Sequence, residues 1–511
     1  MLFKQIVAIV TTSILALAAP AHAEWRKAES DRFIVYSDVG ERQLRDFVQN
    51  LESYDRVLRF RMGLPGDTPT LRKLPIYLVG SSAELARVRP GASATLAGFY
   101  HSSSEDIFGV AIRDRSVDTL KHEYAHHFMM HNFSYAYPGW FVEGFAEYYA
   151  TVEIKPDRFT VGRFNENRAS WLMSAPWMEM SDLLSRRPQE RVANQETYYP
   201  LAWLLTHWFM SDPERQKMLS AYLLDVGAGG DSVEAMERAT GMTMIRLRDT
   251  LRRYTTGTLS FQIVTATIPT AQMTITSLPA SADDLLLLNQ RLKLGVPQAM
   301  RAATAAEVRR MAARHPDDPL ALLALGHAEL HFGDPAAAEA PLQRLLALEP
   351  DHVEALQYLA RARMEAMENT TDPAEIDRLT AEARGFLVRA HRQDDLNYIT
   401  LMLAARNRRN GPGYPNDNDV AVLEQAFALA PQLSEARFDL AQALITQNRN
   451  PEAIALLEPL ANHPHNSSSA ARALLAKARG EAPAEDVDDE AAAVDTPDDD
   501  PAVRTDQALN F

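Results

Sequence analysis

LKHEYAHHFMMHNFSYAYPGWFVEGFAEYYA, residues 120–150, is the stretch that decides how the rest of the chain is interpreted. It contains His122 and His126, four residues apart, and Glu123 directly follows the first histidine. On a helix this spacing places both imidazoles on one face, one turn apart, so that two nitrogens can bind one tetrahedral zinc ion. The glutamate would then point at a water molecule bound to the metal.

The second half of the same stretch supplies a further carboxylate. Pro138-Gly139 breaks the chain, and a second helix is predicted to begin near Trp140. On that helix Glu143 can reach the metal as a third ligand, and Glu147, one turn later, can accept a hydrogen bond from an imidazole N–H. The two halves together predict a zinc centre with three protein ligands and one open position.

The motifs HEYAHH and PGWFVEGFAEYYA resemble those of the gluzincin zinc metallopeptidases. This is the peptidase MA clan, which includes thermolysin and combines HExxH with a downstream glutamate in an EGxAE-type motif. The resemblance covers about residues 25–256, and its specific motifs lie within 120–150. It implies an α+β thermolysin-like metallopeptidase fold and a Zn2+ cofactor held by His122, His126 and Glu143.

Peptide-bond hydrolysis is the activity that this resemblance implies. Glu123 would take a proton from the zinc-activated water as it attacks the scissile carbonyl, and would deliver it to the leaving amine. The developing oxyanion needs a donor besides the metal, and Tyr199 or its neighbour Tyr198 is the candidate; core packing of either phenol is the competing interpretation. Glu147 would orient a ligating imidazole. The sequence contains no GxMEN-like segment that would bind a free amino terminus, which favours an endopeptidase and leaves an aminopeptidase open.

The rival function is a non-catalytic, zinc-stabilised scaffold that interacts with proteins through its C-terminal repeats. Glu123 argues against this rival, because a structural zinc site has no use for a base beside the metal. In the peptidase interpretation the repeats would bind a peptide or protein substrate, bind a separate protein partner, or cover the active-site cleft.

Residues 24–115 are predicted to form an N-terminal α+β subdomain. Apolar residues at helical spacing predict a helix over Glu41–Met62. Short β-rich runs predict strands at Phe33–Tyr36, Leu74–Val79, Leu96–Tyr100 and Ile107–Ile112. The run at Leu96–Tyr100 has two interpretations, a sheet edge on which an extended peptide could lie or an internal strand with a glycine bulge.

Four further segments follow. Residues 116–256 are predicted to form a helical zinc-binding subdomain, and 257–282, rich in Thr, Ser and Pro, a linker that could add one strand. Residues 283–480 are predicted to form an all-α domain of tetratricopeptide-like repeats. Residues 481–511 contain eleven acidic residues and one arginine, which is typical of a disordered acidic tail.

The repeat prediction rests on the offsets of the roughly 34-residue tetratricopeptide unit, two antiparallel helices with small residues where they touch. One unit matches at Leu322, Leu325, Gly326, Glu329, Ala338, Leu342, Leu345 and Pro350, and a weaker copy at Leu440, Ala441, Leu444, Ala453, Leu457 and Leu460. Two histidines in the first unit, His327 and His331, are expected to face solvent. His127 and His131 are expected at the surface or the rim of the cleft, and His207 as a satisfied core histidine.

The overall composition narrows the partners and the compartment. A formal net charge of -16 makes a nucleic-acid partner improbable on electrostatic grounds, since nucleic acid needs a positive surface. Residues 1–23 combine Lys4, an apolar core and Ala21-His22-Ala23, which predicts a signal peptide with no transmembrane segment left after cleavage. The absence of cysteine excludes disulfides. We therefore predict a secreted protein, with the bacterial periplasm as its simplest location.

Overall fold

The computed structural model describes residues 24–66, 70–94, 96–113, 117–133, 135–164, 166–185, 192–257, 259–462 and 468–481. The predicted signal peptide and all but the first residue of the predicted acidic tail lie outside these ranges. Among the helices within them, none has the length and apolar character needed to cross a membrane.

A six-stranded mixed sheet forms the centre of the N-terminal region. Its strands are β1 (Arg26–Glu29), β2 (Phe33–Ser37), β3 (Leu74–Val79), β4 (Gly98–Ser102), β5 (Ile107–Ile112) and β9 (Thr274–Ser277). Their order is β4-β5-β3-β2-β1-β9; β3 runs parallel to both β2 and β5, and the other neighbours are antiparallel. The strand predicted around Leu96–Tyr100 is therefore an edge strand, β4, and the internal interpretation is wrong.

Helices cover both faces of this sheet. Phe33 and Val35 point to the face against which α1 (Glu41–Arg61) and α3 (Val117–Asn132) pack. Tyr77 and Val79 point to the opposite face, beneath α2 (Ser82–Val88) and α11 (Ser281–Leu294). This alternation follows from the two-residue period of a strand, and as a result the α+β region has a separate core on each side of the sheet.

A helical region follows α3. It consists of α4 (Gly139–Ala150), α5 (Glu166–Ser174), α6 (Met180–Ser185), η1 (Gln195–Thr197), α7 (Tyr198–Met210), α8 (Pro213–Gly227), α9 (Ser232–Thr240) and α10 (Met244–Thr255). Two short strands interrupt it, β6 (Glu153–Lys155) and β7 (Arg158–Val161). Helices α4 and α7 approach very closely, because a Cβ on Gly144 would lie 2.5 Å from the carbonyl oxygen of Ala202. The glycine is thus required by the packing of α4 against α7.

The segment 257–282 is more than a linker. Strand β8 (Gln262–Thr265) pairs with β7 and completes a three-stranded sheet, and β9 pairs with β1 at the edge of the large sheet. We expected one added strand at most. The alternating β-branched residues of this segment extend readily, but the two sheet edges that receive them lie far away in the sequence.

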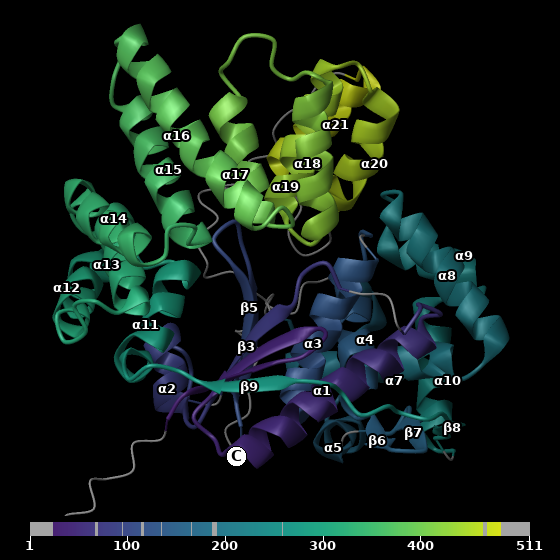
Figure 1. The fold of residues 1–511 in the computed structure, drawn as a ribbon. Helices are drawn as coiled ribbons and strands as arrows, with labels where there is room; N and C mark the ends of the chain where they lie inside the picture. The colour runs from purple at the N-terminus through teal and green to yellow at the C-terminus, as the bar shows by residue number, and fades with distance from the viewer. Residues whose placement is uncertain are drawn as a thin grey trace, which may run out of the picture.

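Ten helices make up the repeat region: α12 (Arg301–Ala312), α13 (Pro319–Phe332), α14 (Glu339–Leu348), α15 (Val353–Glu368), α16 (Pro373–Gln393), α17 (Tyr398–Arg408), α18 (Asp417–Leu429), α19 (Ser434–Thr446), α20 (Asn450–Ala461) and α21 (Ser469–Arg479). Short 3-10 turns, η2 (Gln298–Met300) and η3 (Pro335–Ala337), precede α12 and α14. Gly326 of α13 meets α14 where a Cβ would lie 2.5 Å from Leu342, which agrees with its predicted role as a small contact residue. Figure 1 shows these helices arching from α12–α14 over the sheet to α21.

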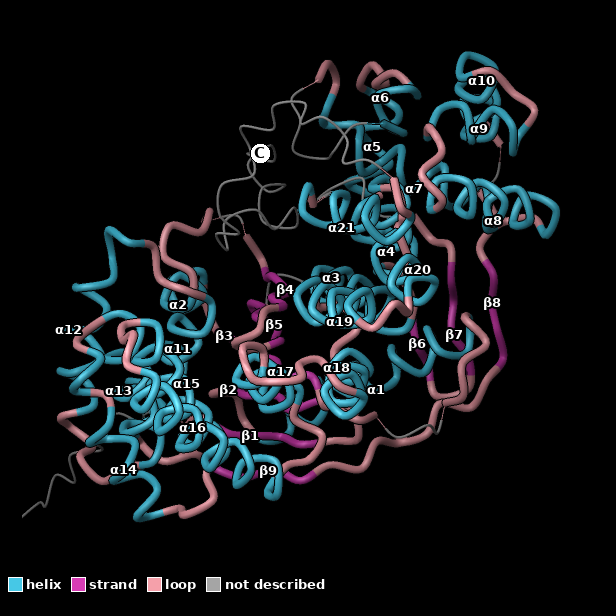
Figure 2. Tube along the Cα trace, turned by 90° about the horizontal axis from the view of Figure 1, so that it is seen from above, coloured by secondary structure: helices cyan, strands magenta, loops and turns pink. Residues whose placement is uncertain are grey.

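The repeats pack onto the α+β region. Tyr398 and Leu401 of α17 are buried in the same apolar cluster as Phe33 and Leu120. Figure 2, the view from above, places α17–α19 over the region of α1 and α3. The fold is therefore an α+β region followed by a helical repeat region, and the two share a core.

Candidate metal centre

Helices α3 and α4 bring three candidate ligand atoms together. His122 Nε2 lies 3.0 Å from His126 Nε2 and 3.3 Å from Glu143 Oε2, and the last two atoms are 3.5 Å apart. Tetrahedral zinc with ligand bonds of about 2.1 Å separates its ligand atoms by about 3.4 Å. The donor set and its spacing therefore fit a zinc ion.

Glu147 lies behind the first histidine, where the sequence placed it. Its Oε1 is 3.4 Å from His122 Nδ1, on the opposite side of the ring from the candidate ligand nitrogen. Arg168 of α5 in turn donates two hydrogen bonds to Glu147, of 2.9 and 3.2 Å. A carboxylate fixed in this way sets both the orientation and the tautomer of the imidazole. Nδ1 of His126, by contrast, is buried with no hydrogen-bond partner among the described residues.

The electrostatics of the cluster favour positive charge between its members. Burial disfavours ionisation of Glu143, but the imidazoles of His126 and His122 outweigh it and hold the pKa of Glu143 well below its usual range. Burial also disfavours protonation of His122, but Glu143 and Glu147 outweigh it and raise the pKa of His122. A divalent cation bound among these side chains would stabilise the negative charge of Glu143, as protonated imidazoles otherwise do.

An ion-pair network fixes α3 against α1 and was not predicted from the sequence. Tyr124, in the middle of the HExxH motif, donates a 2.7 Å hydrogen bond to Asp55. Asp55 is fully buried and also pairs with Arg32 at 2.8 Å and Arg59 at 2.9 Å. The histidine helix is thereby fixed in rotation, so that His122 and His126 keep facing α4.

Glu123 is next to a candidate ligand on the same helix, whereas Tyr199 is linked to the cluster through Arg168. Glu123 is buried on α3 directly after the first histidine, with 6% of its surface exposed. Tyr199, half-buried at the start of α7, is linked to the cluster through Arg168, whose guanidinium lies 5.1 Å from the centre of its ring and also holds Glu147. Tyr198 beside it is buried, with the two phenol rings 5.6 Å apart.

The edge strand β4 lies beside the histidine helix. Tyr100 of β4 contacts His127 of α3 through a 3.0 Å hydrogen bond between the phenol oxygen and Nδ1. One helical turn later, His131 Nδ1 lies 3.3 Å from Gln432, in the repeat region. His127 and His131 are half-buried, and they lie between the edge strand and the repeats.

The remaining histidines divide into one confirmed and one corrected prediction. His207 is buried, with Nε2 at 3.1 Å from the carbonyls of Gly162 and Ser260, and is a satisfied core histidine. His327, expected to face solvent, is 1% exposed, and His331 is half-buried. Helix α13 is buried on nearly all its sides, among α11, α12, α14 and α15 and against the β4–β5 turn, and repeat spacing alone does not reveal how far this burial extends.

Comparisons with known proteins bear on the repeats. Tetratricopeptide-repeat family models match the chain over residues 320–362 and 420–478, which contain the two units predicted from spacing, so that prediction is confirmed. A thermophilic tetratricopeptide-repeat protein of Thermus thermophilus is 23% identical over 39% of this chain and 99% of its own, with a TM-score of 0.33. MamA of AMB-1 is 15% identical over 35% of this chain and 96% of its own, with a TM-score of 0.24. No curated protein matches the chain.

Proposed function

We propose that this chain is a zinc-dependent peptidase of the gluzincin type, in which His122, His126 and Glu143 hold the metal. The observation that carries the proposal is the triangle of ligand atoms with edges of 3.0, 3.3 and 3.5 Å, together with a buried glutamate directly after the first ligand. A purely structural site would need the triangle but not the glutamate.

The chemistry divides between the metal and the chain. A bound zinc ion would supply a Lewis acid and lower the pKa of a coordinated water. Glu123 receives a proton from the attacking water and passes it to the leaving amine. Glu147 holds the imidazole of His122 in place, with Arg168 neutralising the carboxylate. Tyr199, beside Arg168, is the proposed donor to the oxyanion that develops on the scissile carbonyl.

The edge strand suggests how substrate would bind. Among the described strands β4 pairs with β5 alone, so an extended peptide would add to the sheet at its other edge. Since Tyr100 of β4 contacts α3, such a peptide would run alongside the histidine helix. The repeats approach the same place through Gln432 and His131, and in this proposal they would bind protein substrates or restrict access to the metal.

The second candidate function is a zinc-stabilised scaffold. It is favoured by the tetratricopeptide-repeat matches, because such repeats commonly form surfaces for protein partners. In this function the metal only ties α3 to α4, and Glu123 is dispensable. Both candidates share an exported location, which rests on the sequence of residues 1–23.

Two substitutions in the full mature chain test the proposal. Glu123→Gln keeps the size of the side chain and removes the base, so the protein should still bind zinc at this centre and hydrolyse no peptide. Glu143→Ala removes one of three ligands and its charge, so zinc affinity at this centre should fall by at least about tenfold. The measurements are metal content and cleavage of a mixed-peptide library, with and without chelator.

Glu237→Gln is the matched control, since Glu237 is exposed on α9, far in sequence from the motifs, and should leave both metal content and cleavage unchanged. A wild-type protein that binds zinc but cleaves nothing, and whose cellular role Glu123→Gln leaves intact, would contradict the peptidase and support the scaffold.

A further inference from the structure

A second group of potential ligands lies outside the candidate metal centre. His327 and His331, one turn apart on α13, and Glu105, in the turn between β4 and β5, each place one ligand atom so that all three lie within 4.8 Å of one another. This is one of two such groups among the residues that the structure describes. Its members come from segments of the chain more than 200 residues apart, so the fold assembles it.

His331 is oriented as a metal ligand would be. Its Nδ1 lies 3.2 Å from Oε1 of Glu365 on α15. Its Nε2 is buried and has no hydrogen-bond partner in the described portion of the chain. A carboxylate that accepts the Nδ1 proton leaves a lone pair on Nε2, which is the tautomer that metal-binding histidines adopt. An unpaired buried nitrogen is costly, and a metal ion would satisfy it.

His327 lies one helical turn before His331 on α13. It is buried, with 1% of its surface exposed. Tyr358 of α15 contacts its Nδ1 at 2.9 Å and fixes the ring. The imidazole centres of His327 and His331 are 5.3 Å apart, as two histidines at this helical spacing would be around one ion.

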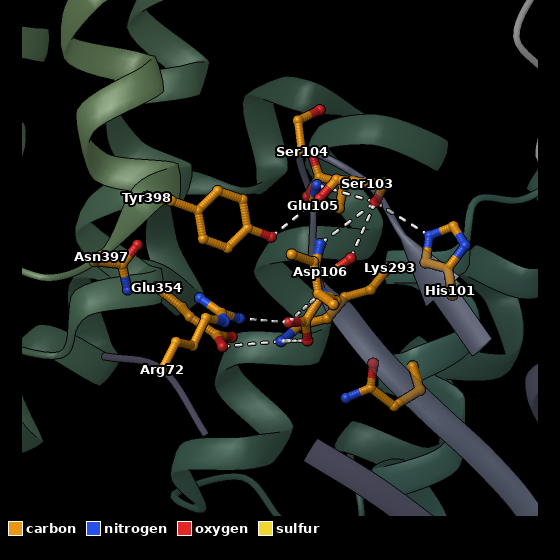
Figure 3. A network of polar contacts seen from close by, with 12 residues as sticks. Arg72, His101, Ser103, Ser104, Glu105, Asp106, Lys293, Glu354, Asn397 and Tyr398 are labelled. Carbon is orange, nitrogen blue, oxygen red and sulfur yellow. Dashed lines mark hydrogen bonds and ion pairs between the residues drawn. The ribbon is translucent and has the colours of Figure 1, made fainter. Parts of the chain in front are cut away.

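Glu105 supplies the carboxylate. Arg361 of α15 lies 2.6 Å from its Oε1 and holds the side chain against the repeats, while a carboxylate has a second oxygen for another ligand. The turn itself is held by its backbone: Tyr398 donates to the carbonyl of Ser103 at 3.0 Å, and Arg361 to that of Ser104 at 3.3 Å. Figure 3 shows Glu105 and Ser104 at the top of this turn, with Tyr398 reaching it from α17.

We propose that His327, His331 and Glu105 form a second divalent metal site, with Zn2+ as its best match, that joins the β4–β5 turn to helix α13. Two imidazoles and one carboxylate are ligands that suit zinc and its neighbours in the transition series rather than Ca2+ or Mg2+. With Glu365 close behind, the two carboxylates and Arg361 leave one net negative charge for the ion to balance. The site is independent of the proposed peptidase activity.

The test counts metal in the full chain. Metal-free protein is titrated with ZnCl2, and bound zinc is measured after removal of the excess. Wild type should bind two equivalents, and His331→Gln and Glu105→Gln one each. His391→Gln, which removes an exposed histidine of α16, is the matched control and should bind two. Glu143→Ala should also bind one, but it should keep the equivalent that His331→Gln loses.

The outcomes separate the two sites. Loss of one equivalent in both His331→Gln and Glu105→Gln, but not in His391→Gln, supports the second site. Equal zinc content in wild type and His331→Gln, or a wild type that binds a single equivalent lost in Glu143→Ala, overturns it and leaves the cluster as a hydrogen-bonded contact. If the candidate centre on α3 and α4 fails instead, wild type should bind one equivalent, which Glu143→Ala keeps and His331→Gln loses. Because Glu105 is partly exposed, its variant decides the question if His331→Gln does not fold.

Discussion

The charge of Lys293 should contribute strongly to the free energy of unfolding. Lys293 lies at the end of α11, with 7% of its side chain exposed, and its ammonium is 3.2 Å from Asp106 Oδ2 and 2.8 Å from Glu354 Oε1. Figure 3 shows this ammonium between Asp106, directly before β5, and Glu354 of the repeats, with Arg72 also reaching the Asp106 carboxylate. Burial favours the neutral amine, but the two carboxylates outweigh it and hold the pKa of Lys293 well above its usual range.

Lys293→Met removes the charge and keeps the length of the side chain. Coulomb's law with an effective dielectric of about 20 gives about 5 kcal/mol for a pair at the Lys293–Asp106 distance. Loss of one partner from a buried pair costs about 3–5 kcal/mol in practice. Arg72 still pairs with Asp106 at 3.0 Å, and Glu354 is more than one-third exposed, so we expect the lower end. The free energy of unfolding should therefore fall by about 3 kcal/mol, or roughly 100-fold in the equilibrium constant.

The assay is urea unfolding followed by circular dichroism, with limited proteolysis to identify which region opens first, because a chain with several cores need not unfold in one step. Lys73→Met is the control, since Lys73 pairs with Glu29 at 2.8 Å on the same sheet but both side chains are about one-third exposed. Lys73→Met should lower the free energy of unfolding by less than about 1 kcal/mol. Adding Asp106→Asn to Lys293→Met should cost less than the sum of the two single substitutions, since both side chains belong to one ion pair. Equal effects of the two lysine substitutions would refute the reasoning.

Two further predictions concern packing and acid. Gly144→Ala drives a Cβ against the α7 backbone and should lower the free energy of unfolding by at least about 1–3 kcal/mol, measured by thermal unfolding. Gly385→Ala, in open space on α16, is the control and should raise it by up to about 1 kcal/mol. Similar shifts in the two variants would show that α4 and α7 can move apart. Burial opposes ionisation of Asp106, but Lys293 and Arg72 outweigh it and lower its pKa, so its contribution to stability is present at neutral pH and lost as the pH falls through the folded-state pKa. Unfolding midpoints measured from about pH 2 to pH 5 should fall more steeply for wild type than for Asp106→Asn, and parallel curves would contradict this.

Much of the fold could be predicted where one short segment contains the whole signal. The strands Leu74–Val79 and Ile107–Ile112 have the predicted bounds, because each is a continuous apolar run that must be buried. The strand β1, RKAE, was missed, since its residues have little β propensity and only pairing with β2 and β9 makes it a strand. Two repeat units could be found because they follow a fixed period, which survives in a single sequence.

The same limit applies to the sites. His122, His126, Glu143 and Glu147 could be grouped because helical periodicity relates each pair of residues on its own helix, and a short connection joins the helices. Asp55, which fixes the histidine helix through Tyr124, could not, since nothing in the sequence pairs residues so far apart. The cluster of Glu105, His327 and His331 was missed for the same reason, and because a helix face covered by another segment of the chain looks like an exposed face in the sequence.

Strand β1 has its two neighbours at very different distances along the chain. β2 follows it within a few residues, but β9 ends at Ser277, just past the middle of the chain. A ribosome that adds about 5–20 residues per second needs roughly 10–50 seconds to travel from one to the other. Throughout that interval the earliest strand has an unpaired edge that can pair with another nascent chain. This edge of β1 is thus open to misassembly until the segment that covers it, far later in the chain, has been made.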